Sequence, residues 1–198
     1  MGIHESMKPQ WCLFLVGEKR ARIIRGEPGN MREVAAIPGD ADEVCARLFA
    51  EFEAEPFDYL AIATPEDRYT GIVNSLHSHV LVKLAGRFDC DAEHSDVAAA
   101  EEAARPLMHE MKRKREEAVL DQLRMDLGKG TGAVATSADV TRALEEKRVG
   151  TLILAPGNEA GTRRVIDLAI AQDAEVIVLD ESPDELDDYD GIAALLRF

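Results

Sequence analysis

Continuous or alternating apolar runs, which are typical of β-strands, follow one another along the chain with segments whose apolar residues recur at helical spacing. In the N-terminal half these patterns predict three short strands joined by tight turns, a helix, a buried strand and a second helix, at residues 11–16, 20–25, 32–37, 42–52, 58–64 and 65–86. A short segment at 87–93 follows. A long helical stretch then runs to residue 127, and Pro106 is expected to interrupt or restart it.

The same alternation continues after a glycine-rich break at residues 128–132. It predicts a strand, a helix, a core strand, a helix and two final apolar runs, at residues 133–135, 137–144, 151–155, 162–171, 174–179 and 192–198. Strands that alternate with helices of this length predict an α/β fold in each half of the chain. The acidic, turn-rich segment 182–190 is predicted to be a solvated loop.

Length and composition exclude several classes of protein. The 198 residues suffice for one large domain or two small ones, and the first residues lack the pattern of a signal peptide. No apolar run approaches the roughly 18 residues of a membrane span. Cys12, Cys45 and Cys90 are widely spaced and form no C-x-x-C pair. They predict reduced thiols in a cytoplasmic protein, with Cys45 in a core.

The net charge of −15 opposes contact with nucleic acid, since an acidic body repels phosphates at long range. Its distribution is uneven, because residues 101–127 carry six basic and seven acidic side chains. This stretch contains the one dense basic run of the chain, Lys112, Arg113, Lys114 and Arg115. Four consecutive helical residues cover about 300° of a helix, so some of them must point outward. An ordinary solvated face, with Glu116 and Glu117 as local partners, is the alternative to a phosphate-binding patch.

Other candidate sites are weaker. His77, His79, His94 and Cys90 suggest a metal cluster, but two histidines two positions apart on a helix do not share a face, so surface histidines are predicted instead. The glycines at 128–132 follow a helix and precede a strand, which is the reverse of a phosphate-binding loop and favours helix termination. Neither a metal nor a cofactor is therefore predicted.

Three ordered stretches of the C-terminal half resemble the last domain of archaeal and eukaryotic release factors and Pelota. They are the helix, glycine break and strand at 120–135, the helix–strand unit at 138–154 and the closing segment at 190–198, Asp-Gly-Ile-Ala-Ala-Leu-Leu-Arg-Phe. In the N-terminal half, residues 11–23, 57–65 and 110–117 are similar to the middle domain of bacterial members of this superfamily.

This resemblance implies a fold class of α/β type. It consists of an N-terminal RNase-H-like mixed-sheet domain, a linking helix and a C-terminal L7Ae-like α/β/α domain. The implied domains are residues 1–106 and 107–198.

The chain departs from the release-factor pattern in the region that carries the family's chemistry. Release factors have a long loop with Gly-Gly-Gln, which positions the hydrolytic water, and the chain contains no Gly-Gly-Gln. The corresponding stretch has only five residues, Pro38, Gly39, Asp40, Ala41 and Asp42. No segment resembles the family's decoding domain, so stop-codon reading is not expected.

The resemblance therefore implies a non-catalytic factor that binds the ribosome near the A site, in hibernation or rescue, like bacterial hibernation factors of the Pelota type. Its implied partners are ribosomal RNA and elongation factor Tu or another translational GTPase. Lys112, Arg113, Lys114 and Arg115 become the predicted RNA contact, with Arg163 and Arg164 as a second one. A peptidyl-tRNA or RNA hydrolase with a substitute catalytic group remains open, and so does a protein-binding adaptor.

Overall fold

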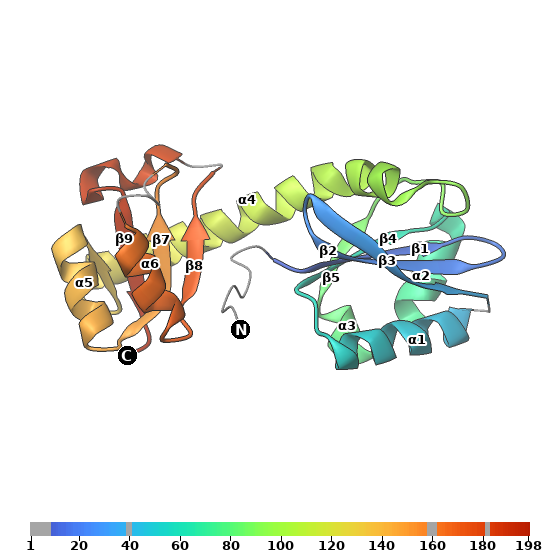
Figure 1. Cartoon of the computed structure of the whole chain (residues 1–198), viewed down its shortest axis with the longest axis horizontal. Coiled ribbons are helices and arrows are strands. Elements are labelled where there is room, and N and C mark those ends of the chain that lie inside the picture. The colour runs from blue at the N-terminus through green and yellow to red at the C-terminus, as the bar shows by residue number, and fades with distance from the viewer. Residues whose placement is uncertain (1–8, 39–40, 158–161, 181–182) are drawn as a thin grey trace. The chain divides into compact units, whose positions relative to one another are not determined.

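The computed structural model describes residues 9–38, 41–157, 162–180 and 183–198. The chain forms two compact units, Met1–Met111 and Lys112–Phe198, and each contains its own β-sheet (Figure 1). Whether the family's domain boundary falls at 106/107 stays a prediction. Among the described residues, no helix combines the length and the apolar character that crossing a membrane requires.

The sheet of the first unit has five strands in the order β3-β2-β1-β4-β5. The first three strands form an antiparallel meander, whereas β1, β4 and β5 run parallel to one another. The strands are β1 (Trp11–Val16), β2 (Ala21–Glu27), β3 (Asn30–Ile37), β4 (Tyr59–Ala63) and β5 (Leu84–Arg87).

Strand β1 is buried along its whole length because both faces of the sheet are covered. One face, which includes Cys12 and Phe14, packs against α1 (Ala41–Ala54), α2 (Glu66–Ser75) and α3 (Ser78–Leu81). The other face, which includes Leu13 and Leu15, packs against the first part of α4 (Val97–Lys129), as Figure 1 shows. The continuous apolar run that predicted this strand thus reflects two separate cores.

Arg25 on β2 closes the C-terminal end of α1. Its guanidinium donates hydrogen bonds to the backbone oxygens of Glu51, Glu55 and Pro56, and it lies 5.6 Å from the centre of the Phe57 ring. The last carbonyls of a helix lack partners within the helix, so a buried cation at this point satisfies them directly.

The prediction of one helix over residues 65–86 is wrong. Helix α2 ends at Ser75, Leu76 is extended, and α3 starts after His77, whose ring Nδ1 accepts a hydrogen bond from the His79 N–H at 3.3 Å. Strand β5 occupies the end of the predicted helix. Its four residues are all half-buried, so they carry no alternation that marks a strand.

Pro106 does not interrupt α4, which is a single helix of 33 residues. A proline inside a helix costs about 3 kcal/mol. Ala104 and Met108, on either side of Pro106, are both buried in the core against the sheet. We infer that this packing offsets the cost.

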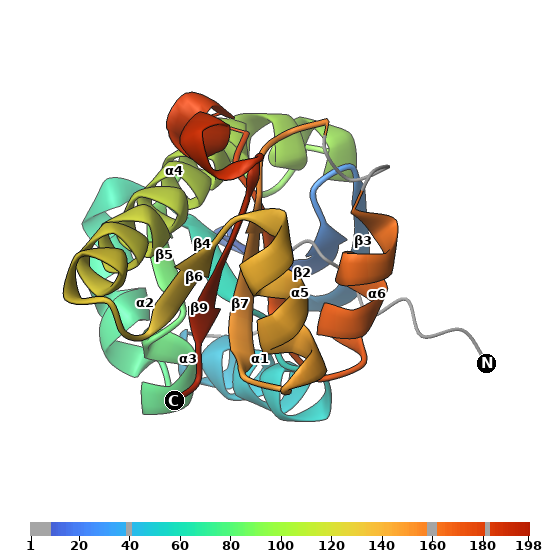
Figure 2. The same cartoon turned by 90° about the vertical axis from the view of Figure 1, so that its left-hand side faces the viewer.

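The second unit has a four-stranded sheet with the order β6-β9-β7-β8, in which β9 is antiparallel to both of its neighbours. Helices α5 and α6 cover one face and the second part of α4 covers the other (Figure 2). This arrangement, with the mixed sheet of the first unit, confirms the predicted α/β fold class. The elements are β6 (Ala133–Ala135), α5 (Ser137–Glu145), β7 (Val149–Leu154), α6 (Arg163–Ile170), β8 (Glu175–Val178) and β9 (Ile192–Leu196).

The acidic segment before β9 is more ordered than the prediction of a solvated loop. It forms the 3-10 helix η1 (Pro183–Tyr189), and Leu186 in this helix is fully buried against the α4 face of the sheet. Leu186 and Tyr189, three positions apart in this helix, both pack against that core, but two apolar residues among acidic ones are too few to mark a helix in the sequence.

We expect removal of residues 191–198 to unfold the second unit. The deletion takes out β9, which supplies Ile192 to one core and Ala193 to the other. It also separates β6 from β7. Burial of one large apolar side chain contributes about 1.5–3 kcal/mol, against a total stability of about 5–15 kcal/mol. Circular dichroism during thermal unfolding measures the loss. Removal of Phe198 alone, which is 79% exposed, is the control and should leave melting unchanged.

We expect Arg25→Met to destabilise the first unit by about 1–3 kcal/mol, because it leaves carbonyls at the end of α1 without donors. The urea midpoint should fall while the slope of unfolding free energy with urea stays constant. Arg32→Met is the matched control, since Arg32 is exposed and pairs with Arg25 across the β2–β3 ladder. Equal midpoints for the two variants would contradict the capping role of Arg25.

Candidate functional site

Segments that lie far apart along the chain meet at one edge of the first sheet. Ala21 at the start of β2 pairs with Val16 at the end of β1 and with Ile37 at the end of β3. The β1–β2 turn and Pro38, which directly follows β3, therefore lie at the same edge. Strand β5 runs parallel to β1 and β4, so the segment that follows Arg87 reaches this edge as well.

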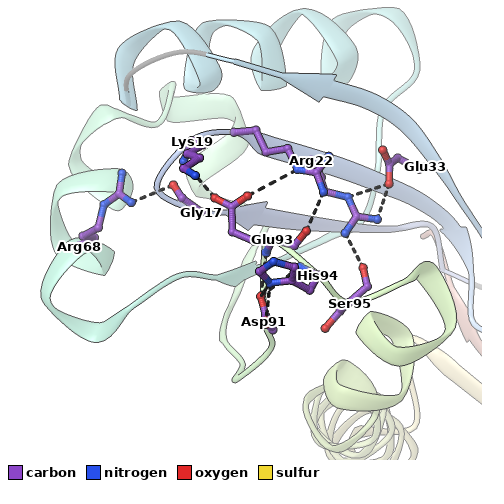
Figure 3. Close-up of polar contacts among 10 residues, drawn as sticks. Gly17, Lys19, Arg22, Glu33, Arg68, Asp91, Glu93, His94 and Ser95 are labelled. Carbon is purple, nitrogen blue, oxygen red and sulfur yellow. Dashed lines mark hydrogen bonds and ion pairs between the residues drawn. The ribbon is translucent and has the colours of Figure 1, made fainter.

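The β1–β2 turn, residues 17–20, is fixed by hydrogen bonds on both sides. The Gly17 N–H donates to the Arg20 oxygen at 3.0 Å and closes the turn. The Arg68 guanidinium, from the first turn of α2, donates to the Gly17 oxygen at 2.8 Å (Figure 3). The backbone N–H groups at the tip of the turn remain available to a further acceptor.

That acceptor is the carboxylate of Glu93, which lies in the segment between β5 and α4 (Figure 3). It accepts a hydrogen bond from the Lys19 N–H at 3.0 Å, and its Oε2 lies 3.6 Å from Nε of Arg20. The Lys19 N–H, with the Arg20 charge and the Glu18 N–H, holds the pKa of Glu93 below its ordinary value. Gly17 permits this approach, since a Cβ atom there would collide with the Glu93 carboxyl group.

Asp91 orders the segment that presents Glu93. Its Oδ1 accepts hydrogen bonds from the backbone N–H groups of Glu93 at 3.0 Å and His94 at 3.1 Å. These two donors lower the pKa of Asp91, and the His94 ring adds a contact of 3.1 Å to Oδ2. Sequence reasoning missed Glu93 because its partner Lys19 lies 74 residues away along the chain. It missed Asp91 because the role of Asp91 is to order the segment that carries Glu93.

Arg22 fastens the other end of this segment to the sheet. Its guanidinium is buried, forms an ion pair with Glu33 on β3 and donates a hydrogen bond to the Ser95 oxygen just before α4 (Figure 3). The turn, the strand that follows it and the 91–95 segment are thus joined by charged groups, in addition to the packing of Ala92 in the core on the α4 side of the sheet.

The predicted basic run lies on α4 at the start of the second unit, and acidic partners compensate much of its charge. Lys112 forms an ion pair with Asp180, Arg113 with Glu117 and Arg115 with Glu175 at the start of β8. Arg113 and Lys114 are exposed, whereas Lys112 and Arg115 are half-buried. The run therefore forms ion pairs between α4 and β8 as well as facing solvent. The sequence did not indicate these ion pairs.

Glu116 is not a member of a solvated face, as the alternative interpretation assumed, because it is 1% exposed. Its Oε1 accepts a hydrogen bond from the Asp180 N–H at 3.2 Å, beyond the end of β8. A sequence signal for this burial does exist. Glu116 lies four residues before the buried Leu120 and eight after the buried Met108, on the apolar stripe of α4.

Arg163 and Arg164 are the first residues of α6 and are exposed, and they have no ion pair with the described part of the chain. Helix α6 covers the face of the sheet opposite to α4. The two predicted RNA contacts therefore lie on helices that cover opposite faces of the sheet. Their role in RNA binding stays a prediction.

In the short segment that is predicted to correspond to the Gly-Gly-Gln loop, Gly39 and Asp40 lie outside the described residues. Pro38 is exposed, and Ala41 and Asp42 belong to the first turn of α1. The Asp42 carboxylate accepts a hydrogen bond from the Ser75 hydroxyl at 2.9 Å. Asp42 is thus engaged with α2.

The histidines lie on the surface, as predicted, although the argument from helical faces does not apply. His77 precedes α3, and its ring lies 5.0 Å from that of His79 and 3.8 Å from that of Phe49. Within the described ranges, no group of three or more His, Cys, Asp or Glu side chains could hold a metal ion.

Two of the three thiols are unreactive because they are buried. Burial raises the pKa of Cys12 to about 12 and that of Cys45 to about 11. This confirms that Cys45 is a core residue, and neither group can supply a thiolate nucleophile near neutral pH.

Neither a protein-family model nor a curated protein matches this chain. Solved structures do match. A model of ribosome-bound archaeal Pelota and ABCE1 aligns with a TM-score of 0.73 and 15% identity, covering 98% of this chain and 62% of that one. Saccharomyces cerevisiae Dom34, described as a translation termination-like factor involved in RNA quality control pathways and interacting with Hbs1, aligns with a TM-score of 0.68 and 13% identity.

The Dom34 alignment covers 95% of this chain and 63% of Dom34. The chain thus spans less than two thirds of the length of either structure. At these identities the similarity concerns the fold. The described units accordingly have the Pelota-type arrangement of a five-stranded mixed sheet and a second, four-stranded sheet, as the sequence resemblance predicted.

Proposed function

We propose that this protein is a non-catalytic, ribosome-associated factor of the release-factor and Pelota type, which acts in hibernation or rescue near the A site. The observation that carries the proposal is the alignment of 98% of the chain with ribosome-bound archaeal Pelota at a TM-score of 0.73. An alignment over both units is more informative than a match to one α/β domain, because single domains of this class serve many functions.

A translational GTPase is the protein partner that we propose. Dom34, which shares the fold, is described as interacting with Hbs1. The sequence resemblance implies that the last domain of this family binds such a GTPase, so we place the contact on the second unit. In a bacterial setting elongation factor Tu would take this place.

Electrostatics permit an RNA contact despite the net charge of −15. Surface ion pairs contribute only about 0–1 kcal/mol, so exposed cations can exchange a carboxylate partner for a phosphate at little cost. Arg113 and Arg115 keep side-chain exposures of 50% and 37% in their pairs with Glu117 and Glu175. We therefore retain Lys112–Arg115 as the proposed RNA contact, with Arg163 and Arg164 as a second one.

A protein-binding adaptor is the second candidate, and the compensation of the basic run favours it. Lys112, Arg113 and Arg115 each have a carboxylate partner in the same unit. An adaptor of this kind would bind its partner with little dependence on salt, whereas phosphate contacts release counterions and give a steep dependence.

We expect the double substitution Arg113→Glu and Lys114→Glu to weaken co-sedimentation with ribosomes. The slope of log affinity against log salt should also become flatter, by about 0.7–0.9 for each phosphate group that the variant no longer neutralises. Exposed charge changes usually alter stability by no more than ~0.5 kcal/mol, so the fold should survive.

The matched control is Lys129→Glu with Arg142→Glu, which makes the same change in net charge with exposed cations outside the basic run. Unchanged binding and salt slope in the first double variant would refute the RNA role of the run. Ribosome binding that depends little on salt in the unmodified protein and is unchanged in the first double variant would support the adaptor. Failure of the unmodified protein to bind ribosomes would refute the proposed function.

We expect the protein not to hydrolyse peptidyl-tRNA. Release of the peptide requires a positioned water, and alignment of reacting groups is a strict geometric demand. The chain has no Gly-Gly-Gln to meet it. Release of a labelled peptide from programmed ribosomes should stay at background. Release above background that disappears in Asp42→Asn would instead establish the hydrolase alternative.

A further inference from the structure

The β1–β2 turn holds an anion that comes from the same chain. The carboxylate of Glu93 lies where the N–H groups of Glu18 and Lys19 converge, beside the guanidinium of Arg20. Adjacent backbone N–H groups in a turn form a concave site that binds anions, as in many phosphate sites. The turn therefore has the donors of an anion-binding site, and Glu93 occupies it.

The carboxylate does not use all of the positive charge around it. Its distance of 3.6 Å from Nε of Arg20 exceeds that of a hydrogen bond. Within the described part of the chain, the Lys19 ammonium has no ion-pair partner and is exposed. The Arg20 guanidinium is held beside the turn by the hydrogen bond that its Nη2 donates to the Glu93 backbone oxygen at 2.6 Å. A tetrahedral anion with more oxygens could accept from both N–H groups, from Nε of Arg20 and from the Lys19 ammonium.

We propose that the β1–β2 turn is a phosphate-binding site, in which Glu93 is a built-in competitor that a phosphate group displaces. The ligand is a phosphate group, either a phosphodiester of single-stranded RNA or inorganic phosphate. Displacement is feasible because Glu93 is held in an irregular segment and its side chain is 26% exposed. Once Glu93 leaves, Lys19, Arg20 and Arg68 remain around the turn.

Gly17 decides whether any anion fits. Its backbone avoids the left-handed region, so alanine is compatible with the conformation, but the added Cβ would occupy the place of the bound carboxylate. Gly17→Ala thus blocks the site without removing a charge. The Gly17→Ala variant therefore distinguishes phosphate binding at the turn from a general attraction of phosphate to the cations at this edge of the sheet.

The test is a titration of the isotope-labelled full chain with inorganic phosphate at constant ionic strength, observed through the Glu18 and Lys19 amide signals. A second arm uses a short single-stranded RNA. In the Glu93→Ala variant we expect affinity to rise by roughly tenfold or more, because phosphate no longer has to break the hydrogen bond between the turn and a charged carboxylate of the same chain. Adding Gly17→Ala should abolish the gain.

Asp67→Ala is the matched control, since it removes the same charge from exposed α2 beside Arg68 and does not contact the turn. It should titrate like the unmodified protein. In the unmodified protein the same amides should shift only at higher phosphate concentration, which tests the site even if Glu93→Ala fails to fold.

Shifts with inorganic phosphate identify a free anion as the ligand, and shifts with RNA alone identify a phosphodiester. Equal affinities in the unmodified protein and the Glu93→Ala variant would overturn the proposal. A gain that persists with Gly17→Ala, or that Asp67→Ala reproduces, would also overturn it. None of these results depends on ribosome binding, so they test the phosphate site independently of the proposed function.

Discussion

Helix α4 is the element on which both units depend, because each sheet needs an apolar layer on the face that its other helices leave open. The first part of α4 supplies Ala100, Ala104 and Met108 to one unit, and the later part supplies Leu120 and Leu123 to the other. Two sheets with one exposed apolar face each would not be stable in water. A single helix thus contributes to two separate cores.

The apolar stripe of α4 is interrupted at the point where the two units divide. Lys112 and Glu116 continue the four-residue spacing that joins Met108 to Leu120, yet both are charged. Their partners are the side chain and the backbone of Asp180. The helix therefore changes from apolar to polar contacts and back within three turns, and the charged residues there combine a structural role with the RNA contact that we propose.

Much of the fold could be predicted, because β1, β4 and β7 are buried strands whose apolar runs follow from coverage on both sides. The missed strand β5 has four half-buried residues, one of them glycine, and its identity comes from pairing with β4 rather than from a local pattern. Helix α4 likewise continues past Pro106 because neighbouring residues pack against the sheet, and rules based on local sequence do not include such packing.

The candidate site was less predictable than the fold. Glu93 acquires its role only when β5 carries the chain back to the β1–β2 turn, and nothing near Glu93 in the sequence marks it as the partner of that turn. The basic run was visible, but its partners Glu175 and Asp180 follow more than fifty residues later. A sequence shows where the charged residues are, but only the fold shows which residues of opposite charge lie next to them.

The position of β9 has a consequence for how the protein is made. This strand is the last of the sheet to be synthesised, yet it lies between β6 and β7. The two outer parts of the sheet cannot join until β9 is available, and such non-local pairing slows folding. All the strands of the first unit, by contrast, precede α4 along the chain. During translation the first unit can assemble early, while the second waits with its apolar strands exposed, and this interval is the one in which a chaperone would matter most.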